Sequence, residues 1–389
     1  MEEWKEYRFT DVASLTNGRA YLQPELQSVG KYKIVRVGNL SGGDKWFYSD
    51  MELPQEKYCN KGDLLYAWAC SFGPYIWEGD KTIYHYHIWK VDVNSAVADK
   101  MFLYYYLKYY TPKWMGFTNG SVMMHITKGS LEKQIVSLPS LPTQQKIASI
   151  LSSLDEKIEV NRRINDNLEQ QAQALYKQWF VNKRQKEWNM GVVSDYYDIT
   201  IGKTPPRKEK QWFSFNEKDR VWVSISDMGT CGIFINNSSE YLTSEAISKF
   251  NVKIVPNNTV LLSFKLTVGR VAISDGIMTT NEAIAHFNTD KEYLLEYTYL
   301  ALKAYEFSNL GSTSSIATAV NSKIIKTMSW MMPDDATLYK FHDLTSPIFI
   351  KIKNNIRENQ KLITLRDTLL PKLMSGELSV NDVSTDLVC

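Results

Sequence analysis

Cysteine is scarce in this sequence, and its spacing excludes two kinds of structural site. The 389 residues include four cysteines, and no two of them form a CxxC motif. The sequence therefore predicts neither a zinc site nor a disulfide framework. The four cysteines are Cys59, Cys70, Cys231 and Cys389.

Long hydrophobic runs are also missing. The stretch that comes nearest to a membrane segment, residues 64–77, is short and is interrupted by Gly73 and Pro74. A bilayer crossing needs about 20 apolar residues. The N-terminus, MEEWKEYRFT, lacks the basic and apolar regions of a signal peptide. We therefore expect a soluble, cytoplasmic protein with no membrane partner.

Charge of one sign is not in excess either. Lys and Arg together number 45 against 43 Asp and Glu, which gives a formal net charge of +2. This balance excludes a uniformly basic coat but permits local basic patches. The length suggests two or three domains, and 44% hydrophobic with 23% charged residues is typical of globular proteins.

What the sequence does contain is an internal repeat with an offset of 194 residues. Pro139 and Pro333 each close a strand-like run, and a long helical pattern follows each proline. In the first helix, residues alternate at spacings of four and three, which is the pattern of a coiled-coil seam. Both copies carry an Asn-x-x-x-Asn step at the same phase. The first seam comprises Ile147, Leu151, Leu154, Ile158, Asn161, Asn165, Leu168, Ala172, Leu175 and Trp179, and the second comprises Phe341, Thr345, Ile348, Ile352, Asn355, Asn359, Leu362, Arg366, Leu369 and Leu373.

The segments before each helix also correspond. TNGR at residues 16–19 parallels TIGK at residues 200–203, and IVRVGNL from Ile34 parallels VWVSISDM from Val221. KGDLLYAW from Lys61 parallels NNTVLLSF from Asn257, and FLYYYLK at 102–108 parallels YTYLALK at 297–303. Alternating and β-branched runs bounded by Gly, Asn and Asp mark these segments as strands, with a few short helices between.

These patterns predict an α+β fold in which two mixed α/β domains are separated by two long antiparallel coiled-coil helices. A pseudo-twofold axis would relate the two halves. We expect a first domain at residues 1–139, a central helix at 140–188, a second domain at 189–333, a C-terminal helix at 334–378 and a tail at 379–389. A buried Asn in each seam would fix the register of the helix pair. Trp179 and Phe180 fit a core position and a partner-docking surface equally well.

The helix ends are marked by helix breakers. Pro142 and Thr143 begin the first helix, and residues 189–191 stop it, which gives about 45 residues or about 65 Å at 1.5 Å per residue. The second helix ends between Pro371 and Gly376.

Catalytic signatures are absent from the sequence. GKT at residues 202–204 resembles the end of a phosphate-binding loop, but that loop requires a glycine where Tyr197 stands. No HExxH motif occurs, and the five histidines have no ligand spacing. His85 and His87 alternate along a strand and would face one side, as satisfied polar residues rather than metal ligands.

Basic residues with aromatic neighbours occur on turn segments of both halves. Lys and Arg on rigid loops neutralise phosphates, and Asn or Arg side chains read base edges, although a solvated loop has the same composition. In the second half Lys203, Arg207, Lys208 and Lys210 precede Trp212, and Lys265 and Arg270 flank a turn at Gly269. The candidate DNA-contacting residues are Arg19, Arg36, Asn39, Lys45, Trp46, His125, Lys203, Thr204, Arg207, Lys208, Lys265 and Arg270.

Three segments carry a resemblance to a known family. LPTQQKIASILSSLDEKIEVNRRINDNLEQQAQALYKQWF at residues 141–180 resembles the central region of the DNA-specificity subunit of Type I restriction-modification systems. ENQKLITLRDTLLPKLMSGEL at 358–378 resembles the C-terminal region of that family, and TIGKTPPRK followed by VWVSISDM resembles the start of its target recognition domains. The resemblance covers nearly the whole chain.

The resemblance implies a DNA-binding subunit with no catalysis and no bound cofactor of its own. It would recruit two modification subunits, which carry S-adenosylmethionine and methylate adenine, and two motor-nuclease restriction subunits. Each target recognition domain would read one half-site of double-stranded DNA, and the helix pair would set an unspecified spacer between two different blocks. Two alternatives remain: a stand-alone methyltransferase or nuclease, and a coiled-coil scaffold that does not bind DNA.

Overall fold

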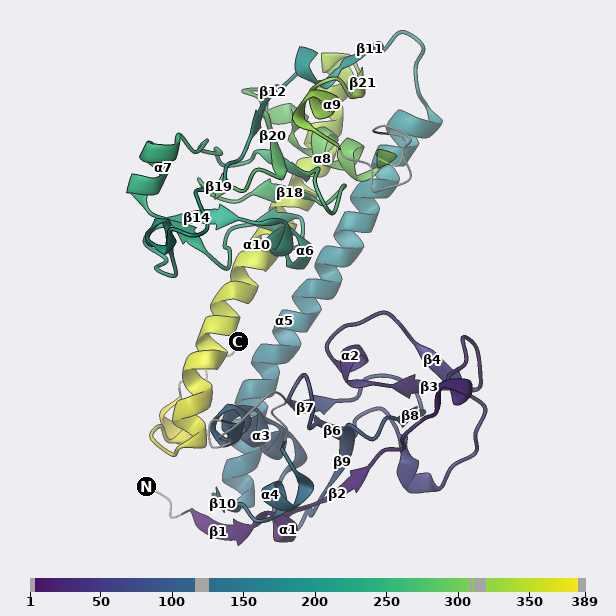
Figure 1. Ribbon diagram of the computed structural model, residues 1–389, viewed down its shortest axis with the longest axis vertical. Helices are drawn as coiled ribbons and strands as arrows, with labels where there is room; N and C mark the ends of the chain where they lie inside the picture. The colour runs from purple at the N-terminus through teal and green to yellow at the C-terminus, as the bar shows by residue number, and fades with distance from the viewer. Residues whose placement is uncertain (1–3, 116–125, 308–309, 311–319, 384–389) are drawn as a thin grey trace. The chain divides into compact units, whose positions relative to one another are not determined.

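The chain divides into two compact units, each of which contains one copy of the repeat. The computed structural model describes residues 4–115, 126–307, 310 and 320–383. Unit 1 comprises residues 1–158 and 361–389, and unit 2 comprises residues 159–360 (Figure 1). Two long helices, α5 (Leu141–Tyr176) and α10 (Asp335–Met374), each contribute residues to both units.

Unit 1 contains two four-stranded sheets and one strand pair. The first sheet has the order β2-β9-β6-β7 and is antiparallel, and the second has the order β4-β3-β8-β5 with β3 and β8 parallel. The pair β1-β10 leads into α5. The strands are β1 (Lys5–Arg8), β2 (Ala13–Asn17), β3 (Tyr32–Val35), β4 (Phe47–Ser49), β5 (Tyr58–Cys59), β6 (Leu64–Ala67), β7 (Gly73–Ile76), β8 (Thr82–Tyr84), β9 (Ile88–Val93) and β10 (Ile135–Leu138). The shorter helices are α1 (Phe9–Val12), α2 (Val37–Leu40), α3 (Lys100–Met115) and α4 (Lys128–Glu132).

Unit 2 repeats this plan with small additions. Its larger sheet has the order β12-β20-β17-β18-β15, its smaller sheet has the order β13-β16-β14-β19, and the pair β11-β21 leads into α10. The strands are β11 (Asn189–Val192), β12 (Asp198–Ile201), β13 (Phe213–Ser214), β14 (Arg220–Val223), β15 (Phe234–Ile235), β16 (Tyr241–Leu242), β17 (Val260–Ser263), β18 (Val271–Ser274), β19 (Thr279–Thr280), β20 (Ile284–Asn288) and β21 (Ser329–Met332). The shorter helices are α6 (Ile225–Thr230), α7 (Ser244–Phe250), α8 (Leu295–Lys303) and α9 (Ser322–Lys326).

Strand registers confirm the internal repeat residue by residue. Thr16 pairs with Lys90 in unit 1, and the corresponding Thr200 pairs with His286 in unit 2. Because a slip of one residue would turn every side chain to the opposite face, matched registers mean matched inner and outer faces. Two further equivalent pairs are Ile34–Ile83 with Trp222–Thr279, both parallel, and Leu64–Val91 with Val260–Phe287, both antiparallel.

The segments 102–108 and 297–303 are helical, so the expectation of strands is wrong there. They lie in α3 and α8. In α3 the Asp99 side chain accepts a hydrogen bond from the backbone N–H of Phe102 at 2.9 Å and caps the helix. The aromatic residues that favour a strand in isolation are buried here on a helix face, because tertiary packing outweighs local propensity.

The seam predicted for the two long helices is confirmed by burial and by hydrogen bonds. Asn161 donates to Asn359 Oδ1 at 2.9 Å, and Asn355 donates to Asn165 Oδ1 at 2.8 Å. An offset of 194 carries Asn161 to Asn355 and Asn165 to Asn359, so each bonded pair is the repeat equivalent of the other. As one partner number rises by four the other falls by four, so the helices run antiparallel.

The ends of the helices differ in part from the expectation. After Tyr176 the first helix continues as a π-helical segment, Lys177–Asn182, and then stops short of residue 189. This wider turn places Phe180 in the core at 1% exposure, whereas Trp179 is half-buried against Phe341, with ring centroids 5.8 Å apart. The second helix passes through Pro371 and ends at Met374, within the expected interval.

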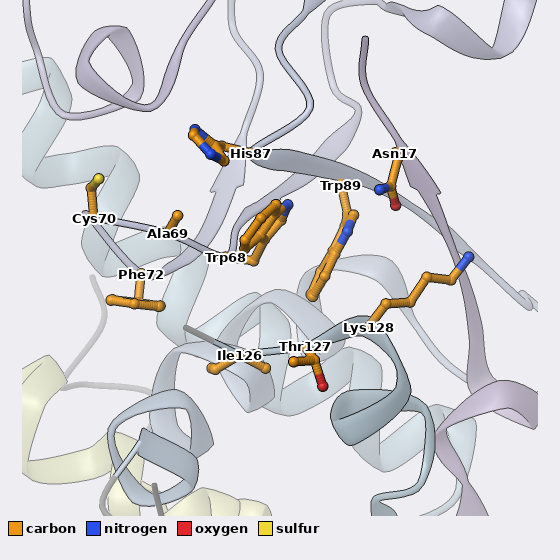
Figure 2. Close-up of a pocket in the computed structure, with 10 residues that line it drawn as sticks. All are labelled: Asn17, Trp68, Ala69, Cys70, Phe72, His87, Trp89, Ile126, Thr127 and Lys128. Carbon is orange, nitrogen blue, oxygen red and sulfur yellow. The ribbon is translucent and has the colours of Figure 1, made fainter. Parts of the chain in front are cut away.

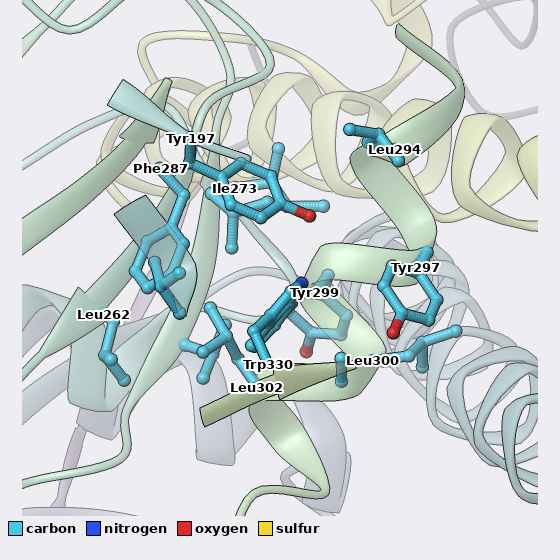
Figure 3. Close-up of a cluster of buried hydrophobic side chains, with 14 of the residues drawn as sticks. Tyr197, Leu262, Ile273, Phe287, Leu294, Tyr297, Tyr299, Leu300, Leu302 and Trp330 are labelled. Atoms are coloured by element: carbon cyan, nitrogen blue, oxygen red, sulfur yellow. The ribbon is translucent and has the colours of Figure 1, made fainter. Parts of the chain in front are cut away.

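The core of unit 2 is built largely from aromatic side chains. The ring of Tyr297 contacts those of Phe180 and Trp330, at centroid distances of 5.0 and 6.1 Å. All three are at most 3% exposed. Figure 3 shows Tyr297 and Trp330 within this cluster. Burying an aromatic or large aliphatic side chain stabilises a fold by about 1.5–3 kcal/mol, so this cluster holds α8 and β21 on the larger sheet.

Candidate nucleic-acid interface

Backbone hydrogen bonds join three segments along one edge of the unit 1 sheets. Arg19 N donates to Tyr84 O at 3.0 Å, and Trp68 N donates to His87 O at 3.1 Å. The segments are residues 18–19, 68–73 and 84–87, and we call them the first rim. They follow β2, connect β6 to β7 and connect β8 to β9.

The same bonds recur in unit 2. Lys203 N donates to Thr280 O, and Phe264 N donates to Ala283 O, both at 2.9 Å. The segments are residues 202–207, 264–270 and 280–283, and we call them the second rim. Each rim therefore presents the side chains that follow equivalent strands, on the same backbone frame.

A glycine makes the closest approach in each rim. A Cβ added to Gly18 would lie 2.3 Å from Tyr84 O, and one added to Gly202 would lie 2.2 Å from Asn281 O. Real Cβ atoms essentially never come under 3.0 Å, so only glycine allows the first segment to pack against the third. This explains why glycine stands in both TNGR and TIGK.

A basic pocket of about 530 Å³ opens on the first rim. Its lining has two cationic side chains and one carboxylate among other polar groups, and it includes Arg36, Lys45, Asp44, Asn39, His85 and Cys70. Among the described residues Lys45 has no carboxylate partner; its ammonium and the Arg36 guanidinium lie 5.4 and 5.2 Å from the centroid of one ring, that of Phe47. Two cations that share one wall favour an anionic or electron-rich ligand.

The predicted residues in this pocket differ in how they are held. Asn39 Oδ1 accepts from Arg36 N at 3.0 Å, and its Nδ2 donates to Gly43 O and Lys45 O, so this side chain shapes the loop. Trp46 does not line the pocket; it is half-buried against Trp77, with ring centroids 6.4 Å apart.

His85 lines this pocket, and the expectation that His85 and His87 alternate along a strand is wrong, because residues 86–87 form a turn between β8 and β9. Burial lowers the pKa of His85 to about 4, and the nearby His87 and Arg36 act in the same direction. The imidazole is therefore neutral at pH 7 and offers one donor and one acceptor. Its place beside Arg36 results from the bend between β8 and β9, which the His-x-His spacing alone does not reveal.

An aromatic pocket of about 640 Å³ adjoins the basic one, since Cys70 and His87 line both. Trp68 and Trp89 stack with ring centroids 5.9 Å apart, and Figure 2 shows them side by side. Trp89 is 2% exposed, and its indole N–H has no partner among the described residues. Lys128 lines the far side, with its ammonium donating to Leu15 O at 2.8 Å.

Arg19, in contrast, is tied down within its own loop. Its guanidinium donates two hydrogen bonds to the Glu25 carboxylate, at 3.0 and 2.7 Å, and lies 5.1 Å from the Tyr21 ring centroid. A phosphate would have to displace Glu25 to use both donors.

Arg207 on the second rim is held in the same way. It donates to both Glu240 oxygens at 2.9 and 2.8 Å and lies 4.3 and 4.5 Å from the rings of Phe213 and Trp222. Half of its side chain is still exposed (50%), and the neighbouring Lys208 is exposed. The guanidinium is thus positioned in advance, which favours a defined contact over a mobile one.

The remaining residues of the second rim take three different roles. Thr204 donates to the Glu282 carboxylate, and Lys203 is exposed while its carbonyl accepts from Trp222 Nε1. Lys265 is exposed at the tip of the β17–β18 loop. Arg270 donates to Ile225 O at 2.6 Å and so holds the first residue of α6 in place.

The structure therefore brings the predicted residues together within each rim or directly beside it. His125 lies outside the described residues. Within the described part of the chain no group of three or more His, Cys, Asp or Glu side chains is arranged to hold a metal ion. No helix in that part is long and apolar enough to cross a membrane.

Comparisons with known proteins bear on the family and the fold of this chain. A family model described as the Type I restriction modification DNA specificity domain matches residues 1–170 and 185–337. The chain is 24% identical to the HindI specificity subunit of Haemophilus influenzae, across 97% of this chain and all of that protein. It is 27% identical to the MjaIX specificity subunit of Methanocaldococcus jannaschii, across 72% of this chain and 70% of that one.

A solved structure is similar in fold. The S subunit of a Type I restriction-modification system from M. genitalium aligns with a TM-score of 0.56 at 16% identity, across 96% of each chain. Since the family model matches most of the sequence, this chain belongs to the DNA specificity subunits of Type I restriction-modification systems, a non-catalytic family that binds target DNA.

Proposed function

We propose that this specificity subunit reads a bipartite, asymmetric DNA target, with one half-site contacted by each rim. One observation carries the proposal: the two rims share equivalent backbone hydrogen bonds from their first and second segments to the third, yet their side chains differ. Arg19 corresponds to Lys203, and Asn39 corresponds to Asp227 in the register of the strands. Because the two rims have the same backbone geometry, both could approach DNA in the same way. Because their side chains differ, they would contact different bases.

The antiparallel helix pair supports a fixed spacer between the half-sites. α5 contains 36 residues, or about 54 Å at 1.5 Å per residue. Its hydrogen-bonded Asn pairs fix the helix register, so the length between the half-sites would be set by the protein rather than by the DNA.

The proposed partners are double-stranded DNA, two modification subunits and motor-nuclease restriction subunits. S-adenosylmethionine would be bound by the modification subunits, and this chain would hold no cofactor. A DNA target also places the protein in the cytoplasm. The DNA contacts would come from Arg36 and Lys45 in the first domain and from Lys203, Lys208 and Lys265 in the second, with Arg19, Arg207 and Arg270 as positioned or supporting residues.

Exchange of one domain tests the bipartite reading. Residues 190–333 would be replaced by the equivalent domain of a related subunit, and the methylated motif would be read by methylome sequencing of cells that express the complete complex. We expect one block of the motif to change while the other block and the spacer persist. A change in both blocks would refute separate reading by the two domains.

The salt dependence of binding separates phosphate contacts from base contacts. Lys208→Ala should lower the slope of log affinity against log salt by about one unit for cognate and scrambled duplexes alike. If Arg207 reads a guanine, Arg207→Ala should cost about 1–3 kcal/mol and relax one base position. Glu240→Gln is the matched control, because it releases Arg207 without removing its charge. Methyl transfer by the purified chain alone would instead support the alternative of a stand-alone enzyme.

A further inference from the structure

Four residues other than glycine adopt a left-handed backbone in the described part of the chain. Two of them are Asn251 and Asn258, with φ of 49° and 59°, and asparagine tolerates this conformation well. The other two are Cys70, with φ of 65°, and Leu266, with φ of 61°. Thr267 N donates to Lys265 O at 2.7 Å across Leu266, but the leucine side chain itself makes no hydrogen bond that would favour this backbone as an asparagine side chain does, so its presence needs another explanation.

Cys70 and Leu266 stand at equivalent positions of the two rims. Each lies two residues after the residue whose N–H begins the loop, Trp68 in one rim and Phe264 in the other. Each is followed three residues later by a glycine that is also left-handed, with φ of 132° at Gly73 and 93° at Gly269. The loop conformation is therefore common to both repeats, and each repeat places a side chain where glycine or asparagine would fit with less strain.

The loop that carries Leu266 is held by its own hydrogen bonds. Ser263 Oγ donates to Thr267 O at 2.6 Å and accepts from Arg270 N at 3.0 Å, and Gly269 N donates to Ser263 O at 3.0 Å. The Leu266 side chain is 100% exposed. A side chain without any packing contact does not stabilise the fold, so a strained and fully exposed leucine points to a ligand outside the chain.

The surroundings of both positions identify that ligand as DNA. Lys265 is exposed beside Leu266, and Cys70 borders the pocket that contains Arg36 and Lys45. An exposed apolar side chain next to a lysine, on the edge proposed to read DNA, suits the contact made with the C5-methyl of thymine. We infer that Leu266 is a base-contacting residue that packs on a thymine methyl in the second half-site, an inference that rests on the proposed function.

The test pairs a protein change with a DNA change. Leu266→Gly removes the side chain and suits the left-handed backbone, so thermal unfolding should occur at the same temperature or higher. Binding by the assembled methyltransferase would be titrated on the cognate duplex and on one whose second-half-site thymines are replaced by deoxyuridine, which lacks the methyl. For the parent we expect the replacement to weaken binding about fourfold, the factor for about 0.8 kcal/mol per buried CH₂-sized group.

For Leu266→Gly the two duplexes should bind equally, and deoxyuridine in the first half-site should affect parent and variant alike. Phe215→Ala is the matched control, since Phe215 is 85% exposed in the same domain but lies outside the rim. If the parent binds its target yet Leu266→Gly loses as much affinity to deoxyuridine as the parent does, or if the parent loses none, the inference is wrong. If the parent complex shows no preference for any duplex, the proposed function itself fails.

Discussion

For the hydrogen bond between Asn165 and Asn355, we expect replacement of the more exposed partner, Asn165, to lower the free energy of unfolding more than replacement of the buried partner. Asn355 is 1% exposed and donates to Asn165 Oδ1 at 2.8 Å, while its own Oδ1 has no partner among the described residues. Asn165 is only half-buried, so water reaches it.

Replacing each partner in turn changes the balance of satisfied polar groups. Asn165→Ala removes the acceptor and leaves the buried Asn355 amide without a partner at either end, which should lower the free energy of unfolding by about 1–3 kcal/mol. Asn355→Leu removes an already unsatisfied buried oxygen and fills the space with apolar atoms, while Asn165 turns to water. That variant should equal the parent or exceed it by about 1 kcal/mol.

Urea unfolding of the full chain measures both values, with unchanged m-values as the check that the denatured state is the same. Asn167→Ala is the control for helix propensity, because Asn167 lies on the exposed face of the same helix. If Asn355→Leu proves more destabilising than Asn165→Ala, side-chain shape rather than hydrogen-bond satisfaction governs this part of the seam.

Three further expectations concern the rims and unit 2. Gly202→Ala should destabilise the chain by about 3 kcal/mol, because its Cβ would meet a backbone oxygen at 2.2 Å. Gly38→Ala is the control: its Cβ would have no atom within 4 Å, so its free energy of unfolding should stay within about 1 kcal/mol of the parent. The midpoints of urea unfolding compare the two variants. Burial lowers the pKa of His286 to about 4, so the unfolded chain takes up the proton first and stability falls as pH drops from about 6.5 towards 4. His286→Gln should therefore reduce the loss between pH 7 and pH 5 by about 2 kcal/mol, and an unchanged loss would show that the imidazole is not the group responsible. Asp275→Asn should cost about 3–5 kcal/mol in thermal or urea unfolding, because this carboxylate is 3% exposed and binds two cations of α10; a cost under 1 kcal/mol would mean that the ion pairs are exposed in solution.

The helix pair could be predicted from the sequence because the spacing of residues within each helix determines which side chains face the partner helix. Spacings of four and three fix which residues face the partner, and the predicted Asn161 and Asn355 are 2% and 1% exposed. The offset between the repeats then supplied the pairing, since two copies of one pattern pack most simply on each other. Strand equivalence followed from the same comparison, and the matched registers confirm it.

The state of the rim side chains could not be predicted in this way. Arg207 and Glu240 are 33 residues apart, and the pairing of β16 with both β13 and β14 brings them together. The left-handed backbone at Leu266 could not be predicted from the residue type, because leucine rarely adopts this conformation. Residues 102–108 show the same limit, since a run of tyrosines is compatible with a strand until the core that buries it is known.

The spacing between equivalent residues shows where the two halves of the repeat differ in length. The offset grows by four and then by eight residues through the sheets, falls by two before the last strand, and stays constant from there into the long helix. The loops between strands thus differ in length between the two halves. One residue inserted into a long helix would rotate the rest of its seam by about 100°, and the constant offset of 194 shows no such difference between the two helices. The successive offsets are 184 between Thr16 and Thr200, 188 between Ile34 and Trp222, 196 between Leu64 and Val260, 194 between Leu138 and Met332, and 194 between Asn161 and Asn355. The length differences therefore lie in loops outside the rim segments 68–73 and 84–87, which are as long as their counterparts in unit 2, and the distance along the two helices is likewise the same in both halves.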